Sequence, residues 1–527
     1  MKKWVALILV FTLLISFTVA CTPKEVTSGD TKTGGETQAP VKTTLNVSTY
    51  SDPQNLNPYA TNSRNAIRIY SQVYERLINR DANKPGEFVG ILAESWKVAD
   101  DGMSVTFNLR KGVKFHNGAE MKASDVVFSF KTMGNSPLVS SSADYILFDQ
   151  VKSTDDYTVV LPLKYKSSLV LAALAASNMV IVNEKAWTEL GDAVSAKAVG
   201  TNKMMIKDGD YQLNNQIIFT RFEEYWGTKA QLEKIVMRVI PESTQAAIEL
   251  ETGTLDLILD VASTDFDRIN DSDTMKLTQF QSNTNDLLNF NNQDAIFKNV
   301  KVRQALAYAM KQEDIFTAVY RNWGRIAYNV ITPDVWGYTG EFEGDKWPYK
   351  YDVEKAKAML TEAGYPNGFS FDIYVDTDAN RKKVSEILKN QFAQIGVTMN
   401  IKNLEGSALN DMLSKGTAQS WLYGVASQTL EPDNAMFIRF HKSVAKNGSS
   451  NYDRYMNDEY SKLLDDARLS FNTNEKAELY AKAQRIWVAE VPSIPYYTRM
   501  AVVASAKNLE GVVGYGEAYL LFDAYFK

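Results

Sequence analysis

Two strand–helix–strand units, separated by a long stretch of chain, constrain the fold of this protein more than any other feature. In the first, an apolar run over 235–240 precedes a helical segment over 243–252 and a second strand over 255–259. In the second, apolar residues alternate over 369–375, keep helical spacing over 384–395, and alternate again over 397–401. Short connections of this kind predict parallel strands with right-handed crossovers. We therefore expect an α/β protein with two sheet-containing lobes.

Two further helices are marked by the residues that flank them. Asn299 and Asp352 each precede an amphipathic run. Such side chains accept hydrogen bonds from the first free N–H groups of a helix. Gly364 follows the second run, where a left-handed residue commonly ends a helix. The sequence therefore predicts helices over 300–311 and 353–363.

The stretch 92–130 is predicted to form a strand, a turn and a helix. Apolar and polar residues alternate over 105–109, which is typical of a half-buried strand. Asp-Asp-Gly at 100–102 favours a turn before it. Ser124 is the expected N-cap of the helix that follows. Taken alone, this pattern also fits an ordinary surface hairpin followed by a helix.

The N-terminal residues indicate export. Two lysines and an apolar run to Ala20 are typical of a secretory signal over residues 1–20. Cys21 is the single cysteine of 527 residues, and Thr18-Val19-Ala20-Cys21 resembles the site at which bacterial lipoprotein precursors are cleaved and lipidated. We therefore predict lipidation at Cys21. The alternative is an uncleaved membrane anchor, because the apolar-biased run from Trp4 to Ala20 is just long enough to span a bilayer.

Residues 21–42 are expected to form a flexible tether. This segment is rich in Thr, Gly, Lys and Glu and has too few apolar residues to order itself. Removal of residues 1–20 would change the net charge from −6 to −8. No basic stripe is present, which argues against a nucleic-acid partner. The sequence is 45% hydrophobic and can build a core for more than one domain.

Residues with catalytic or metal-binding potential are few. His116 and His441 are the only histidines, and neither has a partner at metal-ligand spacing, so we expect both to make structural hydrogen bonds. Nucleophile-elbow and P-loop motifs are absent from the sequence. No pair among the 63 carboxylates is singled out as a glycosidase pair. We therefore expect no catalytic residue, metal or cofactor, and a secreted hydrolase is only a third alternative.

Aromatic residues are the candidates for contact with a ligand. Binding clefts are mainly apolar and aromatic, with a few placed polar groups. The candidates, chosen because they lie in loops or near expected strand ends, are Tyr50, Tyr59, Trp336, Tyr338, Trp421 and Tyr423. For each of them, packing in the core is the alternative, since aromatics carry much of the buried area of a protein.

A resemblance to a known family covers nearly the whole mature chain. The words of 92–130, in the order LAESW, DG, TFNLRKGVKFHNG and ASDVVFSF, resemble the marker segment of the extracytoplasmic solute-binding proteins of peptide- and nickel-type ABC transporters. Further colinear words are LNPY at 56–59, VRQALAYA at 302–309 and EPDN at 431–434. The resemblance implies a two-lobed periplasmic-binding-protein-like fold with an inserted subdomain in the first lobe.

The resemblance also implies domain boundaries. Lobe I would run over 43–280, with the inserted subdomain near 81–190. Lobe II would cover 281–489, and residues 490–527 would return to lobe I. The ligand would be enclosed between the lobes.

Two segments depart from the pattern of the family. Peptide binders place an aspartate for the α-ammonium three residues before the Asp/Glu-Pro pair, and an ungapped alignment on Glu431-Pro432 places Gln428 there. A neutral glutamine can donate and accept hydrogen bonds, which suits hydroxyl or amide groups. Asp433 or Glu431 would be a weak substitute for the missing aspartate. The second departure is GTNKM at 200–204, where the family commonly has GTGPY.

The resemblance implies a lipid-anchored receptor that captures a small solute by lobe closure and passes it to the permease subunits of an ABC importer. It would be a monomer outside the cytoplasm, on the outer face of the cytoplasmic membrane. Peptides are the expected ligands, and an oligosaccharide is the alternative. A solute sensor with the same fold is a further alternative to an importer component.

Overall fold

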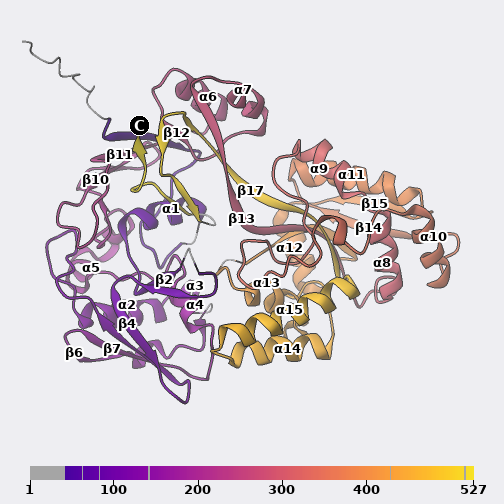
Figure 1. The fold of residues 1–527 in the computed structure, drawn as a ribbon, viewed down its shortest axis with the longest axis horizontal. Helices are drawn as coiled ribbons and strands as arrows, with labels where there is room; N and C mark the ends of the chain where they lie inside the picture. The colour runs from indigo at the N-terminus through magenta and orange to yellow at the C-terminus, as the bar shows by residue number, and fades with distance from the viewer. Residues whose placement is uncertain (1–41, 62, 82–83, 141–142, 428, 516–517) are drawn as a thin grey trace, which may run out of the picture. The chain divides into compact units, whose positions relative to one another are not determined.

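The structure is a computed structural model that describes residues 42–527, except 62, 82–83, 141–142, 428 and 516–517 (Figure 1). The predicted signal segment 1–20, Cys21 and nearly all of the predicted tether therefore lie outside the described residues, as does Gln428. Among the described helices, none is long and apolar enough to cross a membrane.

The strands, drawn as arrows in Figure 1, fall into one large sheet and four small ones. They are β1 (Thr44–Thr49), β2 (Ile78–Arg80), β3 (Phe88–Gly90), β4 (Ala93–Val98), β5 (Ser104–Leu109), β6 (Lys152–Asp155), β7 (Thr158–Pro162), β8 (Met204–Met205), β9 (Tyr211–Gln212), β10 (Gln216–Arg221), β11 (Lys234–Val239), β12 (Leu257–Ile258), β13 (Met275–Phe290), β14 (Ser370–Val375), β15 (Thr398–Asn403), β16 (Ser420–Ala426), β17 (Ser493–Ala506), β18 (Leu509–Glu510), β19 (Val513–Tyr515), β20 (Ala518–Leu520) and β21 (Tyr525–Phe526).

The α-helices are α1 (Arg64–Val73), α2 (Ala123–Gly134), α3 (Pro137–Ser140), α4 (Val170–Leu174), α5 (Glu184–Leu190), α6 (Ser243–Glu251), α7 (Phe266–Asn270), α8 (Val300–Ala309), α9 (Gln312–Tyr320), α10 (Val353–Glu362), α11 (Ala379–Ala393), α12 (Gly406–Lys415), α13 (Pro432–Phe440), α14 (Asp458–Leu469) and α15 (Thr473–Glu490). Short 3-10 helices are η2 (Phe148–Gln150), η3 (Gly191–Ser195), η4 (Ser263–Asp265), η5 (Gly344–Lys346) and η6 (Lys442–Val444).

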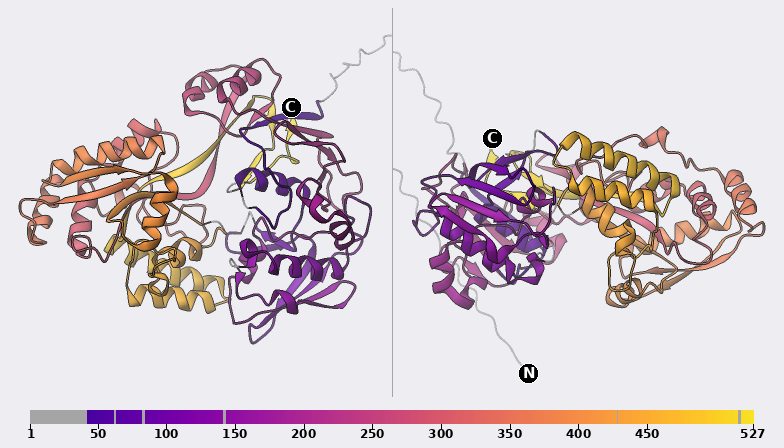
Figure 2. Two further views of the ribbon diagram at one scale, coloured as in Figure 1. Left: turned by 180° about the vertical axis from the view of Figure 1, so that it is seen from behind. Right: turned by 90° about the horizontal axis from the view of Figure 1, so that it is seen from below.

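One eleven-stranded sheet holds the chain together, in the order β15-β14-β16-β13-β17-β12-β1-β11-β10-β8 with β9 beside β10. Its middle is the long antiparallel pair β13 and β17, which Figure 2 also shows side by side from behind. The register of this pair shifts between Gln281 and Asn285, and again after Asp286. The ladder is therefore irregular near its midpoint.

Two large hydrophobic cores are built along this sheet. The first takes its residues from 45–259 and 503–526, and the second takes its residues from 287–497. We call the two parts lobe I and lobe II. The fold is thus α/β and two-lobed, as predicted. The boundaries predicted near 280 and 490 stay a prediction.

Within lobe I, a separate four-stranded sheet has the order β4-β5-β7-β6. Val105, Phe107 and Leu109 of β5 are buried and alternate with more exposed residues, which confirms the predicted strand. The predicted turn before it contains Gly102 at a positive φ, a conformation that costs glycine little. These strands lie inside the segment predicted as an insertion.

The first predicted strand–helix–strand unit is β11, α6 and β12. Both strands run parallel, but β1 lies between them and pairs with each. Hydrophobic periodicity reports which residues are strand and does not report which strands are neighbours, so the sequence analysis missed this intervening strand. The second unit is β14, α11 and β15, whose two strands pair directly in parallel from Ser370 opposite Thr398 to Val375 opposite Asn403.

Helix capping agrees with the sequence at two helices and differs at a third. Asn299 accepts a hydrogen bond from the N–H of Lys301, and Asp352 accepts one from Lys355, as predicted. The prediction that Ser124 caps α2 is wrong, because α2 already begins at Ala123. The carboxylate of Asp125 accepts the N–H of Lys122 at 2.9 Å and so fixes an earlier start.

Candidate ligand-binding site

The carboxyl end of the parallel strands in lobe I carries a buried ion pair. Arg68 of α1 donates from both terminal nitrogens to Asp260, which follows β12, at 2.7 and 2.9 Å. Its side chain is 2% exposed. Thr49 at the end of β1 and Asn65 accept further hydrogen bonds from the same guanidinium. In open α/β sheets this edge is where ligands bind.

Tyr50 follows β1 at this edge and is 48% exposed, more than most large side chains. Its N–H donates to Asp260 at 3.3 Å. A cavity of about 20 Å³ lies beside it, lined by Thr49, Pro241 and Asp260 among others. Such a volume is about enough for one water molecule. Lobe I therefore presents an exposed tyrosine next to a buried ion pair at this edge.

The corresponding edge of lobe II carries a larger ionic cluster. Asp286 of β13 accepts two hydrogen bonds from Arg499 of β17, at 2.9 and 2.7 Å. A terminal nitrogen of Arg381 lies 3.8 Å from the same carboxylate, and the other terminal nitrogen donates to Asp376 just after β14. Burial alone would lower the pKa of Arg499, but Asp286 outweighs it and holds that pKa above its ordinary value.

The Nε of Arg381 is buried and has no hydrogen-bond partner among the described residues. Its guanidinium lies 5.4 Å from the centre of the Tyr423 ring. Asp378 accepts the N–H of Arg381 at 2.9 Å and caps α11, which sets where this side chain begins. The Arg381 guanidinium is therefore surrounded by Asp376, Asp286 and the Tyr423 ring at the carboxyl edge of the parallel strands of lobe II.

Two tyrosines that were not predicted border this cluster. Tyr497 lies opposite Asp286 in the ladder of β13 and β17. Its ring stacks on Tyr320 with centroids 3.5 Å apart. Burial raises the pKa of both phenols, so they stay neutral at ordinary pH.

The six aromatic candidates have different surroundings. Tyr59 and Trp421 are 4% and 1% exposed, and Tyr59 donates to the carbonyl of Val180. Their burial favours the packing alternative for these two. Tyr50 and Tyr423 lie at the carboxyl edges, and Trp336 of lobe II lies against the backbone of Gly86 of lobe I. Tyr338 is partly buried and donates to Glu343 at 3.1 Å. Contact of any of them with a ligand stays a prediction.

Both histidines make hydrogen bonds that hold the fold. His116 lies between the carbonyl of Asn202, 2.9 Å from its Nε2, and the N–H of Gly200, 3.3 Å from its Nδ1. Burial lowers its pKa to about 4, opposed by the Asn202 carbonyl. The Asn202 side chain donates in turn to the Ser71 carbonyl. A residue of the segment 200–204 that differs from the family pattern therefore makes its own hydrogen bond within lobe I.

His441 contacts Ser443 through Nδ1 at 2.7 Å, and its Nε2 lies 3.3 Å from Asp465. Within the described part of the chain, no group of three or more His, Cys, Asp or Glu is placed to hold a metal ion.

The ionic residues at the two edges were missed by the sequence analysis, although two signals point to them. Asp260 and Asp376 each follow an apolar strand closely, where carboxyl-edge residues are expected. Gly424 lies inside a strand, and such a glycine often marks a close approach. A side chain added there would come within 3.1 Å of both Asp286 and Arg499.

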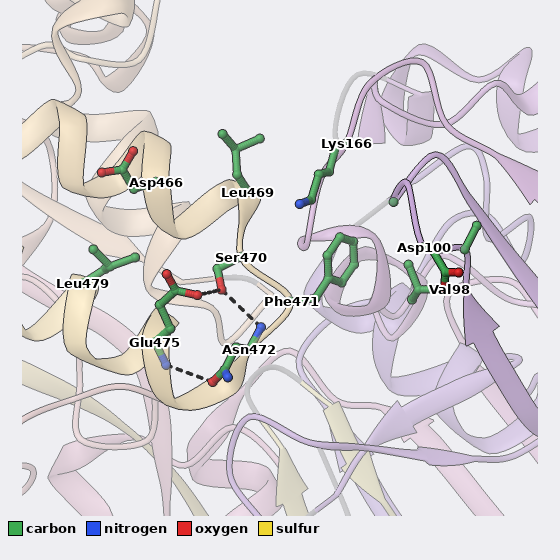
Figure 3. A pocket seen from close by; sticks show the side chains of 12 residues that line it. Val98, Asp100, Lys166, Asp466, Leu469, Ser470, Phe471, Asn472, Glu475 and Leu479 are labelled. Atoms are coloured by element: carbon green, nitrogen blue, oxygen red, sulfur yellow. Dashed lines mark hydrogen bonds between the residues drawn. The ribbon is translucent and has the colours of Figure 1, made fainter.

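A larger cavity of about 680 Å³ lies elsewhere, between the β4–β5 turn and the turn from α14 to α15 (Figure 3). Phe471 of lobe II points across it toward Val98 and packs against the core of lobe I. The Lys166 ammonium lies 5.9 Å from that ring. None of the aromatic candidates lines this cavity, and its lining residues do not include the carboxyl ends of the parallel strands, so we place the candidate site at those ends.

Comparison with known proteins matches this architecture. Residues 87–447 match the model of the bacterial extracellular solute-binding proteins, family 5 (middle region). Heme-binding protein A of Haemophilus influenzae is 31% identical over 483 residues, which is 86% of each chain. The dipeptide-binding protein of Escherichia coli is 29% identical over 471 residues, covering 84% of this chain and 86% of that protein.

Solved structures agree with these matches. HbpA2 from Haemophilus parasuis superposes with a TM-score of 0.83 at 28% identity, over 92% of this chain and all of that one. A dipeptide-binding protein from Pseudoalteromonas in complex with Met-Leu gives a TM-score of 0.72 at 27% identity, with the same coverage. These proteins are binding proteins and not enzymes. This chain therefore belongs to family 5 of the bacterial extracellular solute-binding proteins, which serve as the binding components of ABC importers.

Proposed function

We propose that this protein captures short peptides between its two lobes and delivers them to the permease of an ABC importer. The observation that carries the proposal is the lobe II cluster at the carboxyl edge of the parallel strands, where Arg381 and Arg499 surround Asp286. A peptide brings a carboxylate and amide groups, and a guanidinium binds a carboxylate strongly. The family and the dipeptide-binding relatives support the same ligand class.

The heme named for one relative is less well supported as a ligand here. Heme iron is commonly held by a histidine. Both histidines of this chain are engaged in structural contacts away from the two carboxyl edges. Peptide is therefore the ligand class that we test first.

The presence of Gln428 leads to a prediction about which peptides bind. With glutamine in the place of the ammonium-binding aspartate, a free α-amino group would lose its charged partner, at a cost on the order of a thousandfold in affinity. We therefore expect peptides with a blocked amino terminus to bind at least as well as free ones.

Isothermal calorimetry with a pool of di- and tripeptides, the same pool after N-acetylation, and a pool of sugar oligomers tests both proposals. Binding of the sugar pool alone would contradict the peptide assignment and favour the oligosaccharide alternative. Binding of free peptides that disappears on acetylation would contradict the role given to Gln428.

Lobe closure is the expected mode of capture, because a ligand touches both lobes only when they approach. Small-angle scattering should give a smaller radius of gyration with saturating ligand than without it. An unchanged radius would indicate a rigid pocket.

We also propose that Cys21 carries a lipid that holds the receptor at the outer face of the cytoplasmic membrane. Diacylation together with an amide-linked chain exceeds the marginal affinity of a single acyl chain. Labelling with a fatty acid should be lost in Cys21→Ser while folding is unchanged. Labelling that persists in the serine variant would contradict the assignment.

A further inference from the structure

A hairpin of lobe I contacts lobe II. Strands β2 and β3 pair from Ile78 opposite Gly90 to Arg80 opposite Phe88. Ile78 is fully buried in the lobe I core, and Phe88 packs against that core. The Arg80 guanidinium lies 5.3 Å from the centre of the Phe88 ring. The hairpin is therefore part of lobe I, and the Phe88 ring supports the Arg80 side chain.

The charged end of Arg80 pairs with two groups of lobe II. One terminal nitrogen lies 3.2 Å from a carboxylate oxygen of Glu431, and the other donates to the carbonyl of Thr429. The side chains of Arg80 and Glu431 are 9% and 2% exposed. A guanidinium presents its donors in a fixed fork, so it can hold a carbonyl and a carboxylate together.

Glu431 has a second cationic partner within lobe II. Lys476 of α15 lies 3.2 Å from its other oxygen and 5.0 Å from the centre of the Trp336 ring. The backbone of Gly86, in the β2–β3 turn, lies against the same ring, since a Cβ there would be 2.1 Å from the Trp336 Nε1. Removal of Arg80 would leave Glu431 and Lys476 as a matched pair of charges.

The segment 429–431, which we call the ligand loop, contains a strained residue. Leu430 has a positive φ. A left-handed conformation is unfavourable for a non-glycine residue, because its Cβ comes too close to the following carbonyl oxygen. The N–H of Leu430 donates to the carbonyl of Ser427 at 2.8 Å, and Ser427 in turn donates to the carbonyl of Asn283 in β13 at 2.9 Å. Such strain persists where surrounding contacts enforce it, and it is common at functional sites.

We propose that Arg80 is a positioning residue that holds the ligand loop in its binding conformation only while the lobes are together. Its terminal nitrogens donate to the carbonyl of Thr429, one residue before the strained Leu430, and to the carboxylate of Glu431, one residue after it. Separation of the lobes removes both contacts and releases the loop. This inference rests on the proposed function, in which Gln428, the residue before this loop, takes the place of the residue that meets the peptide amino terminus.

The first experiment measures the inter-lobe distance without any ligand. In a Cys21→Ser background, spin labels at Lys131→Cys in lobe I and Lys389→Cys in lobe II, both exposed positions, report that distance by pulsed electron resonance. We expect Arg80→Met to shift the distribution toward longer distances, with an unchanged Tm. Arg80→Lys should shift it less than Arg80→Met does, because an ammonium keeps the charge but lacks the fork that holds both acceptors. Arg238→Met is the matched control, since its ion pair with Glu249 lies within lobe I.

The second experiment measures affinity for the di- and tripeptide pool by calorimetry. Loss of charge-assisted hydrogen bonds from Arg80 should raise the Kd about ten- to hundredfold, and Arg238→Met should not change it. A lower Tm with unchanged affinity and distance would show a merely structural residue and overturn the proposal. An unchanged distance distribution in Arg80→Met would also overturn it, whether or not peptides bind. If wild-type protein binds no peptide but the distribution still shifts, the proposed function fails and the role of Arg80 in holding the lobes together stands.

Discussion

Lobe I and lobe II carry similar charged groups at the carboxyl ends of their parallel strands, but they use them differently. In lobe I one arginine, 2% exposed, is matched by Asp260 and by two neutral acceptors. In lobe II, Arg499 pairs with Asp286, and Arg381 lies between Asp286 and Asp376. Lobe I therefore holds one arginine with a single carboxylate, whereas lobe II gathers two arginines around two carboxylates.

Substitution of Asp260 should give the largest loss of stability. Asp260→Asn replaces the carboxylate that pairs with the buried Arg68 by a neutral amide. Such a loss costs about 3–5 kcal/mol of the free energy of unfolding. Asp376→Asn is the matched change in lobe II and should cost less, because Arg381 retains Asp286 nearby. Urea denaturation of both variants measures the difference, and equal losses would remove the distinction between the two lobes.

Substitution of Arg381 should give the largest loss of binding. Arg381→Met removes the expected partner of the peptide carboxylate, and we expect the Kd for the peptide pool to rise about a hundredfold. Asp286 keeps Arg499, so the free energy of unfolding should fall less than in Asp260→Asn. Calorimetry and denaturation on the same preparation separate the two effects. An unchanged Kd would place the ligand elsewhere.

Acid should weaken lobe I through His116. Its pKa in the folded protein is about 4, below the ordinary value of 6.5, so the neutral form is favoured by folding. This contribution is fully present above the ordinary pKa and is lost as the pH falls through the folded pKa, by about 3 kcal/mol. Denaturation between pH 7 and pH 4 should therefore show a loss of stability in the wild type that exceeds the loss in His116→Gln by that amount.

His441 of lobe II provides the comparison for that experiment. Burial lowers its pKa, but Asp465 opposes the shift, so a smaller acid effect is expected from this residue. If His441→Gln removes more of the acid sensitivity than His116→Gln, the assignment of that sensitivity to lobe I is wrong.

The smallest expected effect concerns a second contact between the lobes. Ser168 of lobe I donates its N–H to the carbonyl of Arg468 at 2.8 Å and its hydroxyl to that of Ala467 at 3.2 Å. It therefore satisfies the last turn of α14 from the other lobe. Ser168→Ala removes only the hydroxyl bond and should lower the free energy of unfolding, measured in urea, by about 1 kcal/mol. A loss as large as that at Asp260 would show that this contact, too, belongs to the core.

The sequence predicted the elements of the fold better than their neighbours in space. Alternation identified β5 and β14, and short polar side chains identified the caps of α8 and α10, because these signals are local. The insertion of β1 between β11 and β12 has no local signal. The same reason applies to the site, since Arg68 and Asp260 are 192 positions apart, and Asp286 and Arg499 are 213 apart.

Aromatic residues show a second limit of sequence analysis. Trp421 and Tyr423 lie two positions apart on one strand, yet the first is fully buried and the second is partly exposed beside Arg381. Both residue types suit a core as well as a cleft, so composition and alternation did not distinguish them. Gly424, between Tyr423 and the buried Val425, was the more informative residue. Because it has no side chain, it leaves room for the Asp286–Arg499 ion pair.

The path of the chain through β13 and β17 has a consequence for the order of folding. The lobe II core uses one continuous stretch of chain, whereas the lobe I core needs residues 503–526 in addition to 45–259. Leu257 of β12, for example, pairs with Ser505. During export from the N-terminus, the part of the protein that emerges first is therefore completed last. Until residues 503–526 have emerged, the hydrophobic core of lobe I lacks its last strands. The apolar surface that is then exposed makes the chain prone to aggregation and open to proteases.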